Sequence, residues 1–344
     1  MPPLTQSMQA VQIVQYHRPF RLTRCKIPRL ETGEVLVEVK SSGLCSTDLH
    51  LLDGRQDLGK LPRIPGHESA GAIVELGPGV AGWRTGQRVV VVIDVTCGKC
   101  RHCLTGQTQR CAAMQRIGFE RDGGHAEYVA VPAQNLIELP DTLSYEDACI
   151  LPDATACMYH SLVSQGHIGP NQKVLILGAG GLGMHGIQIA RLAGAEVAAT
   201  SRRPHRLKEA ARLGAVPINP DEMDLSEAVR AFSGSEGLDL VADCVGTRES
   251  ISQGFDLLRP GGKLLVIAYL DRSFEFPSMP LFSREKQIIG CRGTNKLELK
   301  EVVELVARER LQSIIGARFA LSDFIRATET LERGDIVGRV AITR

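Results

Sequence analysis

Short apolar runs rich in β-branched residues, separated by Gly and Pro, characterise the chain from residue 8 to about residue 137. Such runs, bounded by turn-forming residues, are typical of β-strands. The clearest runs are residues 35–39, 71–76, 88–93 and 126–131. This part of the sequence therefore predicts a β-rich domain.

The pattern changes from residue 169 onward, where apolar strands alternate with amphipathic helices. This alternation is typical of a doubly wound parallel sheet with helices on both faces, and it makes the chain α/β overall. The predicted strands are residues 173–177, 196–200, 238–244, 263–268 and 287–291. The last fifty or so residues predict a helix followed by one strand at 338–342, a segment able to return to the first domain.

Composition narrows the class of partner. The 344 residues suit about two domains of roughly 150 residues each. The 40 Lys and Arg against 39 Asp and Glu leave a net charge of +1, without the basic surface that nucleic-acid binding needs. We expect a small-molecule partner and no nucleic acid.

Location is predicted from what the sequence lacks. Its apolar runs fall far short of the roughly 20 residues that cross a bilayer, so no membrane association is expected. Residues 1–19 carry no secretory pattern, which predicts a cytoplasmic protein. In a reducing compartment the ten cysteines are candidates for metal binding rather than for disulfides.

A glycine-rich turn follows strand 173–177 directly and opens an apolar helical pattern. In a dinucleotide site the first Gly permits the turn, the second lets the backbone approach a diphosphate, and the third lets helix pack on strand. A turn that serves packing alone is the alternative. The candidate cofactor-binding residues here are Gly178, Gly180, Gly181, Leu182 and Gly183.

The end of the second strand bears on the choice of cofactor. An NAD site usually has Asp or Glu about 20 residues after the glycine turn. This chain instead has Ser201, Arg202 and Arg203, just before a predicted helix. Cations oppose the macrodipole at a helix N-terminus, so these arginines are easier to explain if they bind an anion. The sequence favours NADP(H) over NAD(H), and two solvated arginines beside bound NAD are the alternative.

Four cysteines, Cys97, Cys100, Cys103 and Cys111, stand close together in a polar loop. Four thiolates close a tetrahedron around one zinc and leave no open position, which predicts a structural zinc site. An iron–sulfur cluster is a weaker alternative. Cys45 and His67 are two further possible ligands, but either could equally be a buried core residue, and a third ligand would have to come from elsewhere.

Taken together, these motifs resemble those of the zinc-dependent alcohol dehydrogenases of the medium-chain dehydrogenase/reductase superfamily. GLCSTDLH at 43–50 is similar to the family's first zinc-ligand stretch, and GHESAG at 66–71 to its GHExxG signature. The cysteine loop resembles its structural zinc lobe, and GAGGLG at 178–183 its dinucleotide turn. The resemblance extends over nearly the whole chain, from about residue 8 to residue 344.

The resemblance implies a GroES-like β-rich catalytic domain that is split in sequence around a Rossmann domain. The expected boundaries are 1–156 for the first part of the catalytic domain, with the zinc lobe at 95–113, and 157–294 for the Rossmann domain. Residues 295–344 are expected to rejoin the catalytic domain.

The resemblance also implies a catalytic zinc, and so two zinc ions per chain. Cys45 and His67 correspond to its ligands, and Glu68 to a carboxylate near the metal that sometimes coordinates it. The third ligand, most often Cys in the family, falls at Asp153. Asp serves in some NADP-dependent secondary alcohol dehydrogenases, and a buried Asp that makes only hydrogen bonds is the alternative.

Further roles carry over in the same way. Thr47 corresponds to the hydroxyl that takes the substrate's proton, His50 to the end of the proton relay, and Asp48 to a partner of the zinc-binding histidine. Arg339 corresponds to a contact with the cofactor's pyrophosphate. Zinc would act as a Lewis acid during hydride transfer between an alcohol, aldehyde or ketone and the nicotinamide.

Other functions remain open at this point. A polyol or sugar dehydrogenase of the same superfamily, using NAD(H), also binds zinc. A zinc-free enoyl or quinone reductase is disfavoured by the presence of Cys45 and His67. A non-catalytic zinc module would explain the cysteine loop but not the dinucleotide turn. By resemblance we expect a homotetramer or homodimer, paired through strand 287–291.

Overall fold

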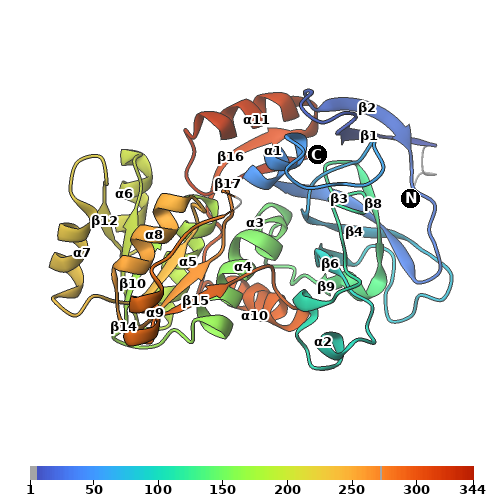
Figure 1. Ribbon diagram of the computed structural model, residues 1–344. Coiled ribbons are helices and arrows are strands. Elements are labelled where there is room, and N and C mark those ends of the chain that lie inside the picture. The colour runs from blue at the N-terminus through green and yellow to red at the C-terminus, as the bar shows by residue number, and fades with distance from the viewer. Residues whose placement is uncertain (1–5, 272) are drawn as a thin grey trace. The chain divides into compact units, whose positions relative to one another are not determined.

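The computed structural model describes residues 6–271 and 273–344 and divides the chain into two compact units (Figure 1). Unit 1 comprises Met1–Asp153, Thr294–Arg308 and Ile315–Arg344, and unit 2 comprises Ala154–Gly293 and Glu309–Ile314. Residues 1–5, which belong to the predicted first domain and to the segment inspected for a secretory pattern, lie outside the described residues. In the described part, no helix combines the length and the apolar character needed to cross a membrane.

A seven-stranded sheet forms the centre of unit 1. Its longest strand, β3 (Glu34–Leu44), pairs antiparallel with β4, β8 and β17. Alternate residues of a strand share one face, and Val35, Val37 and Val39 accordingly pack into one apolar core. The other strands are β4 (Glu68–Leu76), β5 (Arg88–Val91), β8 (Tyr128–Pro132), β9 (Leu136–Glu138), β16 (Ile315–Ala320) and β17 (Arg339–Thr343).

Smaller elements surround this sheet. Two separate strand pairs are β1 (Ser7–Gln12) with β2 (Arg21–Lys26), and β6 (Asp94–Val95) with β7 (Gln115–Arg116). The helices are α1 (Ser46–Leu52), α2 (Arg101–Leu104), α3 (Tyr145–Cys149), α10 (Lys296–Ala307) and α11 (Phe324–Arg333). Short 3-10 turns occupy Thr108–Arg110, Ala133–Asn135 and Leu321–Asp323. After α3 the chain passes from unit 1 into unit 2 through a π-helical turn (Leu151–Thr155), and α4 (Ala156–Tyr159) and a second π-helical stretch (His160–Gln165) belong to unit 2.

The strand register of unit 1 gathers chemically active residues at one end of the sheet. Gly43 on β3 pairs with Glu68 on β4, and Leu44 pairs with Val340 on β17. Cys45, directly after β3, and Arg339, the first residue of β17, therefore lie at the same sheet end as Glu68. Three segments distant in sequence meet there because of strand pairing.

Unit 2 is a six-stranded parallel sheet in the order β12-β11-β10-β13-β14-β15. This is the order of the dinucleotide-binding doubly wound fold, so the predicted α/β class and parallel sheet are confirmed. The strands are β10 (Lys173–Leu177), β11 (Glu196–Thr200), β12 (Val216–Ile218), β13 (Leu238–Asp243), β14 (Leu258–Val266) and β15 (Gln287–Gly290).

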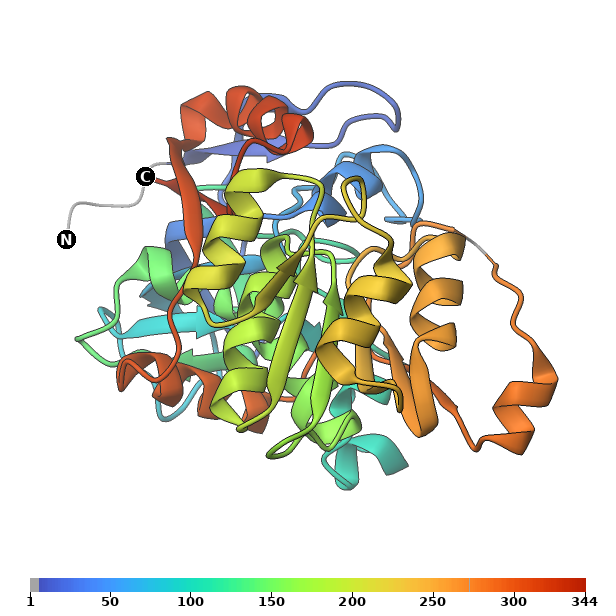
Figure 2. The ribbon, with the colours of Figure 1, turned by 90° about the vertical axis from the view of Figure 1, so that its left-hand side faces the viewer.

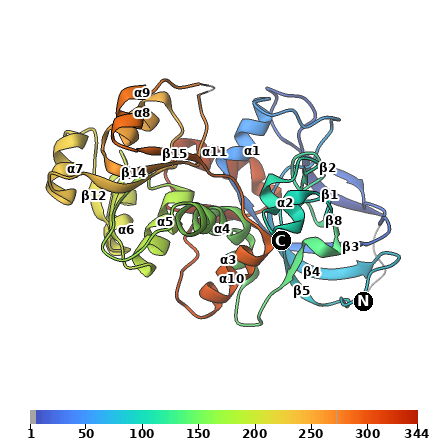
Figure 3. The same cartoon turned by 60° about the horizontal axis from the view of Figure 1, so that its bottom comes forward.

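Helices cover both faces of this sheet. They are α5 (Gly181–Leu192), α6 (Pro204–Arg212), α7 (Leu225–Ser233) and α8 (Arg248–Asp256), with the short α9 (Ser278–Ser283) before β15. Figure 3 shows α5 and α6 on one face and α7 and α8 on the other. Val229 of α7 and Phe255 of α8 pack on Leu175 of β10 in one apolar core.

The segment after residue 295 differs from its prediction. It contains two helices, α10 and α11, and two strands, β16 and β17, where a single helix and a single strand were expected. Strand β16 was missed because its residues alternate between half-buried and exposed, and it carries Gly316 and Arg318 in place of an apolar run.

Candidate active site

Helix α1 presents several of the predicted residues at the end of β3. Cys45 is its N-cap, and its sulfur lies 3.5 Å from the backbone N of Thr47. The Asp48 carboxylate turns back and accepts a hydrogen bond from the backbone N of Cys45 at 3.0 Å. This reciprocal cap fixes the Cys45 side chain relative to the helix. The Cys45 thiol also lies 3.7 Å from Asp153.

Three potential ligand atoms meet at this point, from Cys45, His67 and Asp153, all within 4.8 Å of one another. Cys45 Sγ lies 3.7 Å and His67 Nε2 lies 3.6 Å from Asp153 Oδ2. Bonds of about 2.0 to 2.3 Å at tetrahedral angles put zinc ligand atoms about 3.3 to 3.8 Å apart. The spacing and the S, N, O donor set fit a zinc ion with one position left open.

The electrostatics of this cluster also favour a cation. His67 is buried, and burial alone would lower its pKa, yet its contacts with Asp153 and Cys45 raise the pKa well above the usual value. For Asp153 the opposing effect of burial is outweighed by His67 and by the charge of Arg339, so its pKa lies well below the usual range. The carboxylate and thiol around His67 therefore favour a positive charge at this point, which a metal ion can supply.

Glu68 and Arg339 form a buried ion pair beside this cluster. The Arg339 guanidinium lies 3.1 Å (Nε) and 3.0 Å (Nη2) from Glu68 Oε1, and its Nη2 lies 2.5 Å from Asp153 Oδ2. Burial raises the pKa of Glu68 to about 7, although Arg339 opposes the rise. Arg339 thus neutralises two carboxylates in this structure, and its expected contact with a cofactor pyrophosphate stays a prediction.

Asp48 is enclosed by donors in the same region. Its Oδ1 accepts a hydrogen bond from the backbone N of Gly66 at 3.2 Å and lies 3.9 Å from His67 Nδ1. Its Oδ2 lies 3.4 Å from Nε2 of His125, a residue that the sequence analysis missed. Burial would raise the pKa of Asp48, but the two histidines and the backbone donor of Cys45 lower it. The carboxylate is held in its charged form.

Thr47 and His50 share helix α1. The Thr47 hydroxyl lies 3.5 Å from Cys45 Sγ, next to the ligand cluster. Burial, together with the charge of Arg55, lowers the pKa of His50. A hydrogen bond between Thr47 and His50 is not found among the described residues, so the predicted relay stays a prediction.

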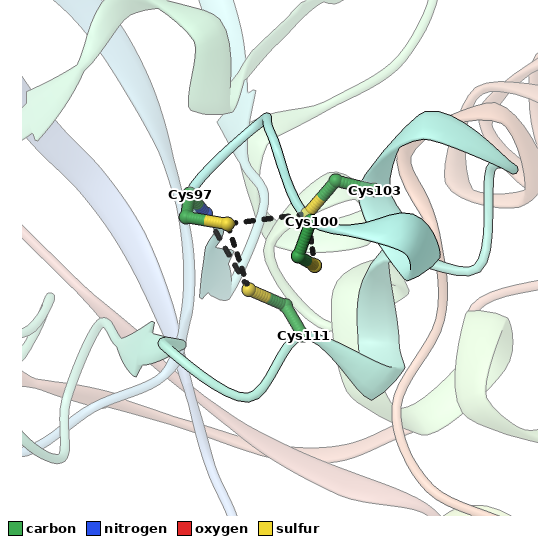
Figure 4. A group of neighbouring side chains, drawn as sticks. All are labelled: Cys97, Cys100, Cys103 and Cys111. Carbon is green, nitrogen blue, oxygen red and sulfur yellow. Dashed lines mark hydrogen bonds between the residues drawn. The ribbon is translucent and has the colours of Figure 1, made fainter.

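The four predicted structural cysteines lie together (Figure 4). Their sulfur atoms are 3.9 Å (Cys97–Cys103), 3.5 Å (Cys100–Cys103) and 3.6 Å (Cys97–Cys111) apart. Sulfur atoms bound to one tetrahedral zinc are about 3.8 Å apart, so this set also fits the metal. Backbone N–H groups of Lys99 and Cys100 lower the pKa of Cys97 to about 6, which favours the thiolate that binds metal.

The glycine turn of unit 2 has the geometry that its sequence predicts. Gly178 has a positive φ of 90°, and a Cβ on Gly183 would lie 2.2 Å from the Gly178 carbonyl oxygen. The backbone N of Gly178 donates to Thr200 Oγ1 at 3.0 Å, which ties the turn to the end of β11. Gly180 is the N-cap of α5 and has open space where a Cβ would stand, leaving room for a ligand. Gly181 and Leu182 follow in the first turn of the helix.

The predicted 2′-phosphate residues lie between β11 and α6. The Ser201 hydroxyl accepts a hydrogen bond from the backbone N of Arg203, the N-cap of α6. The Arg202 side chain is 76% exposed and lies 3.3 Å from Asp221, a partner that the sequence analysis did not find. This pair is solvent-exposed on both sides, so an anionic ligand can compete for Arg202.

Comparison with known proteins identifies the family. The Alcohol dehydrogenase GroES-like domain matches residues 31–141, and the Zinc-binding dehydrogenase family matches residues 181–308. An alcohol dehydrogenase from Geobacillus stearothermophilus is 30% identical over 97% of this chain and 99% of its own length. The chain belongs to the zinc-dependent alcohol dehydrogenases of the medium-chain dehydrogenase/reductase superfamily.

Two further proteins are similar to this chain in sequence or structure. The L-galactonate-5-dehydrogenase of Escherichia coli K12 is 30% identical over 98% of each chain. A thermostable alcohol dehydrogenase from Pyrobaculum aerophilum, solved with cobalt and zinc bound, is 31% identical with a TM-score of 0.88 over 98% of this chain and 100% of its own. The protein is therefore an oxidoreductase of this family, with a GroES-like and a Rossmann domain as predicted.

Proposed function

We propose that this enzyme transfers a hydride between a small-molecule alcohol and its aldehyde or ketone, with NADP(H) as the cofactor. The observation that carries the proposal is the convergence of Cys45, His67 and Asp153 within 4.8 Å, beside the Thr47 hydroxyl. A set of three protein ligands with one open position is the arrangement of a catalytic zinc. The four-cysteine loop would hold the second, structural zinc of each chain.

The protein's own residues supply the proton path and the charge balance. When bound, the zinc polarises the substrate oxygen and the nicotinamide gives or takes the hydride. Thr47 would hold the proton of the substrate hydroxyl, and His50 would pass it to solvent. Because burial and Arg55 lower the pKa of His50, its imidazole stays neutral, and able to accept this proton, to a lower pH than an exposed histidine.

The choice of NADP(H) is supported by the residues that follow β11. Ser201, Arg202 and Arg203 stand where an NAD site usually has an acidic residue. The ion pair of Arg202 with Asp221 is exposed and is worth about 0 to 1 kcal/mol, so a phosphate that Arg202 can bind in bidentate fashion displaces it readily.

A homodimer or homotetramer is part of the proposal. Strand β15 stands at the edge of the six-stranded sheet, where a second copy could continue the pairing. The preceding helix α9, in the orange segment that stands apart from the sheet in Figure 2, exposes Met279 by 69% and Phe282 by 83%. Light scattering on the purified enzyme gives the number of copies directly, and a monomer would contradict this part.

One second candidate is a polyol or sugar-acid dehydrogenase using NAD(H). The similarity to L-galactonate-5-dehydrogenase favours it, as does a carboxylate, Asp153, in the ligand cluster. Primary alcohols, secondary alcohols, polyols and their carbonyl forms, each assayed with both cofactors, separate the two candidates. Faster turnover of simple alcohols or carbonyls with NADP(H) supports the first, and faster turnover of polyols with NAD(H) overturns it.

A further inference from the structure

His125 is a fully buried histidine that the proposed reaction does not use. Its ring is held from several sides. Nδ1 lies 2.9 Å from the Ser42 hydroxyl, and the ring packs edge-on against Phe324 with centroids 4.7 Å apart. A Cβ on Gly66 would come within 2.8 Å of Nδ1, so only glycine lets the ring lie against the backbone just before His67. The neighbours therefore fix both ring nitrogens.

The surroundings also determine which nitrogen carries a proton. Nε2 of His125 faces Oδ2 of Asp48 at 3.4 Å. A carboxylate oxygen can only accept, so Nε2 must be the donor. In the neutral ring Nδ1 then accepts the hydroxyl proton of Ser42. Asp48 thus selects the tautomer that points a donor at it, and the Ser42 hydroxyl complements that tautomer by donating to Nδ1.

The Asp48 carboxylate stands between two histidine rings. Oδ2 faces His125, and Oδ1 lies 3.9 Å from Nδ1 of His67, whose Nε2 faces Asp153. Neither His67 Nδ1 nor His125 Nε2 makes a hydrogen bond of normal geometry to any described residue. Both are buried donors directed at one carboxylate. A small movement of Asp48 would therefore change the distance between its carboxylate and His67 Nδ1.

We propose that His125, oriented by Ser42, is a positioning residue for the catalytic metal site. It keeps the Asp48 carboxylate facing Nδ1 of His67 at 3.9 Å, so that the Nδ1–H is directed at Asp48 and the lone pair of Nε2 is directed at the metal. A hydrogen bond from the second nitrogen of a ligating histidine fixes its tautomer and increases its basicity. This inference rests on the proposed function, since it takes His67 as a zinc ligand.

The test measures how fast each metal ion leaves the protein. A chromophoric chelator added to the zinc-loaded enzyme should reveal two phases of zinc release. The phase that disappears in Cys45→Ser belongs to the catalytic site, and the phase that disappears in Cys100→Ser belongs to the cysteine loop. The visible spectrum of the cobalt-substituted enzyme gives a second readout of the geometry at His67.

His125→Phe keeps a ring of similar size but removes the donor, whereas His125→Gln keeps an N–H in a similar place. Loss of a partner of a ligating histidine typically lowers metal affinity 10- to 100-fold, so we expect about tenfold faster release in the catalytic phase of His125→Phe and a smaller change in His125→Gln. Ser42→Ala should act in the same direction as His125→Phe. The cysteine-loop phase should not change.

Phe324→Leu is the matched control, because it loosens packing on the same ring without touching its polar contacts. Equal effects of Phe324→Leu and His125→Phe would overturn the inference, as would an unchanged catalytic phase in folded His125→Phe. If His125→Phe does not fold, Ser42→Ala decides: unchanged release and an unchanged cobalt spectrum refute the inference. A parent enzyme without the Cys45-dependent phase would instead refute the proposed function.

Discussion

Replacing Arg339 with Met removes the only cation that the structure places against both Glu68 and Asp153 among the described residues. Met keeps much of the apolar length of the side chain but leaves the fully buried Glu68 without its cation, while Asp153 keeps His67 at 3.6 Å. Removing one member of a buried ion pair costs about 3 to 5 kcal/mol, because the remaining charge stays desolvated. We expect the free energy of unfolding of metal-free unit 1 to fall by that amount.

The single tryptophan of the chain makes the measurement specific to this unit. Trp83 packs against the apolar core of unit 1, so its fluorescence follows the unfolding of that unit in urea. With a urea dependence of about 1 to 3 kcal/mol per molar, the loss should move the midpoint by at least about 1 M. Arg308→Met is the matched control: its pair with Glu304 is exposed, and we expect a change of at most about 0.5 kcal/mol.

The pH dependence supplies a second test of the same reasoning. The pKa of Glu68 is about 7, above its ordinary value of 4.5, so folding binds a proton there. Its contribution to stability is complete below about pH 4.5 and is lost as the pH rises through about 7. Without Arg339 the pKa of Glu68 rises further, and the loss continues to higher pH. The stability gap between Arg339→Met and the parent should therefore widen between pH 6 and pH 9.

Adding Glu68→Gln to Arg339→Met should recover part of the loss, because it removes the buried carboxylate that has lost its cation. The reasoning is refuted if Arg339→Met lowers the free energy of unfolding by less than about 1 kcal/mol at every pH. A contribution that small is typical of a solvent-exposed ion pair, not of a buried one.

The remaining predictions concern metal, proton and cofactor. Cys100→Ser should remove one zinc per chain and lower the melting temperature while the folded fraction keeps activity, whereas Cys45→Ser should remove the other zinc and abolish turnover. Elemental analysis checks both variants, and a fully active protein with fewer than two zinc ions per chain contradicts the prediction. His50→Gln should lower turnover mainly at low pH, where proton acceptance limits the rate, and added imidazole should restore it; an unchanged pH profile argues against a relay. Arg202→Ala with Arg203→Ala should raise the KM for NADPH by about tenfold to a hundredfold and leave the KM for NADH nearly unchanged. The reason is that each charge-assisted hydrogen bond to the phosphate contributes about 1.5 to 3 kcal/mol. Tighter binding of NADH than of NADPH by the parent enzyme would contradict the proposed preference for NADP(H).

The parallel sheet could be predicted closely because its signals are local. The apolar run 173–177 and the glycines after it lie within about ten residues, and β10 occupies Lys173–Leu177 as predicted. Strand β16 could not be found in this way, because an edge strand with one exposed face has no continuous apolar run. Its pairing with β17 depends on the tertiary fold.

The same distinction applies to the candidate site. The four cysteines stand within one loop, and their spacing alone indicates a metal site. Asp153 follows Cys45 by 108 residues, and only the family resemblance pointed to it. His125 had no local signal, because its role depends on the approach of the loop before β8 to α1. Arg339 was expected at a cofactor, and its pairing with Glu68 follows from strand register that the sequence does not display.

The register of β17 has a consequence for how the protein is made. Arg339 follows Glu68 by 271 residues, so a ribosome synthesises both carboxylates and the whole of β10 to β15 before their cation exists. The β3–β4 pairing that buries Glu68 can form early, but during that interval it would enclose a charge without a partner. Because burial raises the pKa of Glu68 and Arg339 opposes that rise, a folded segment that lacks Arg339 favours the neutral acid at this position. If translation stops before β17, all strands of the parallel sheet are present, but β3 in unit 1 lacks its β17 partner. The unpaired edge of β3 is then accessible to proteases and chaperones.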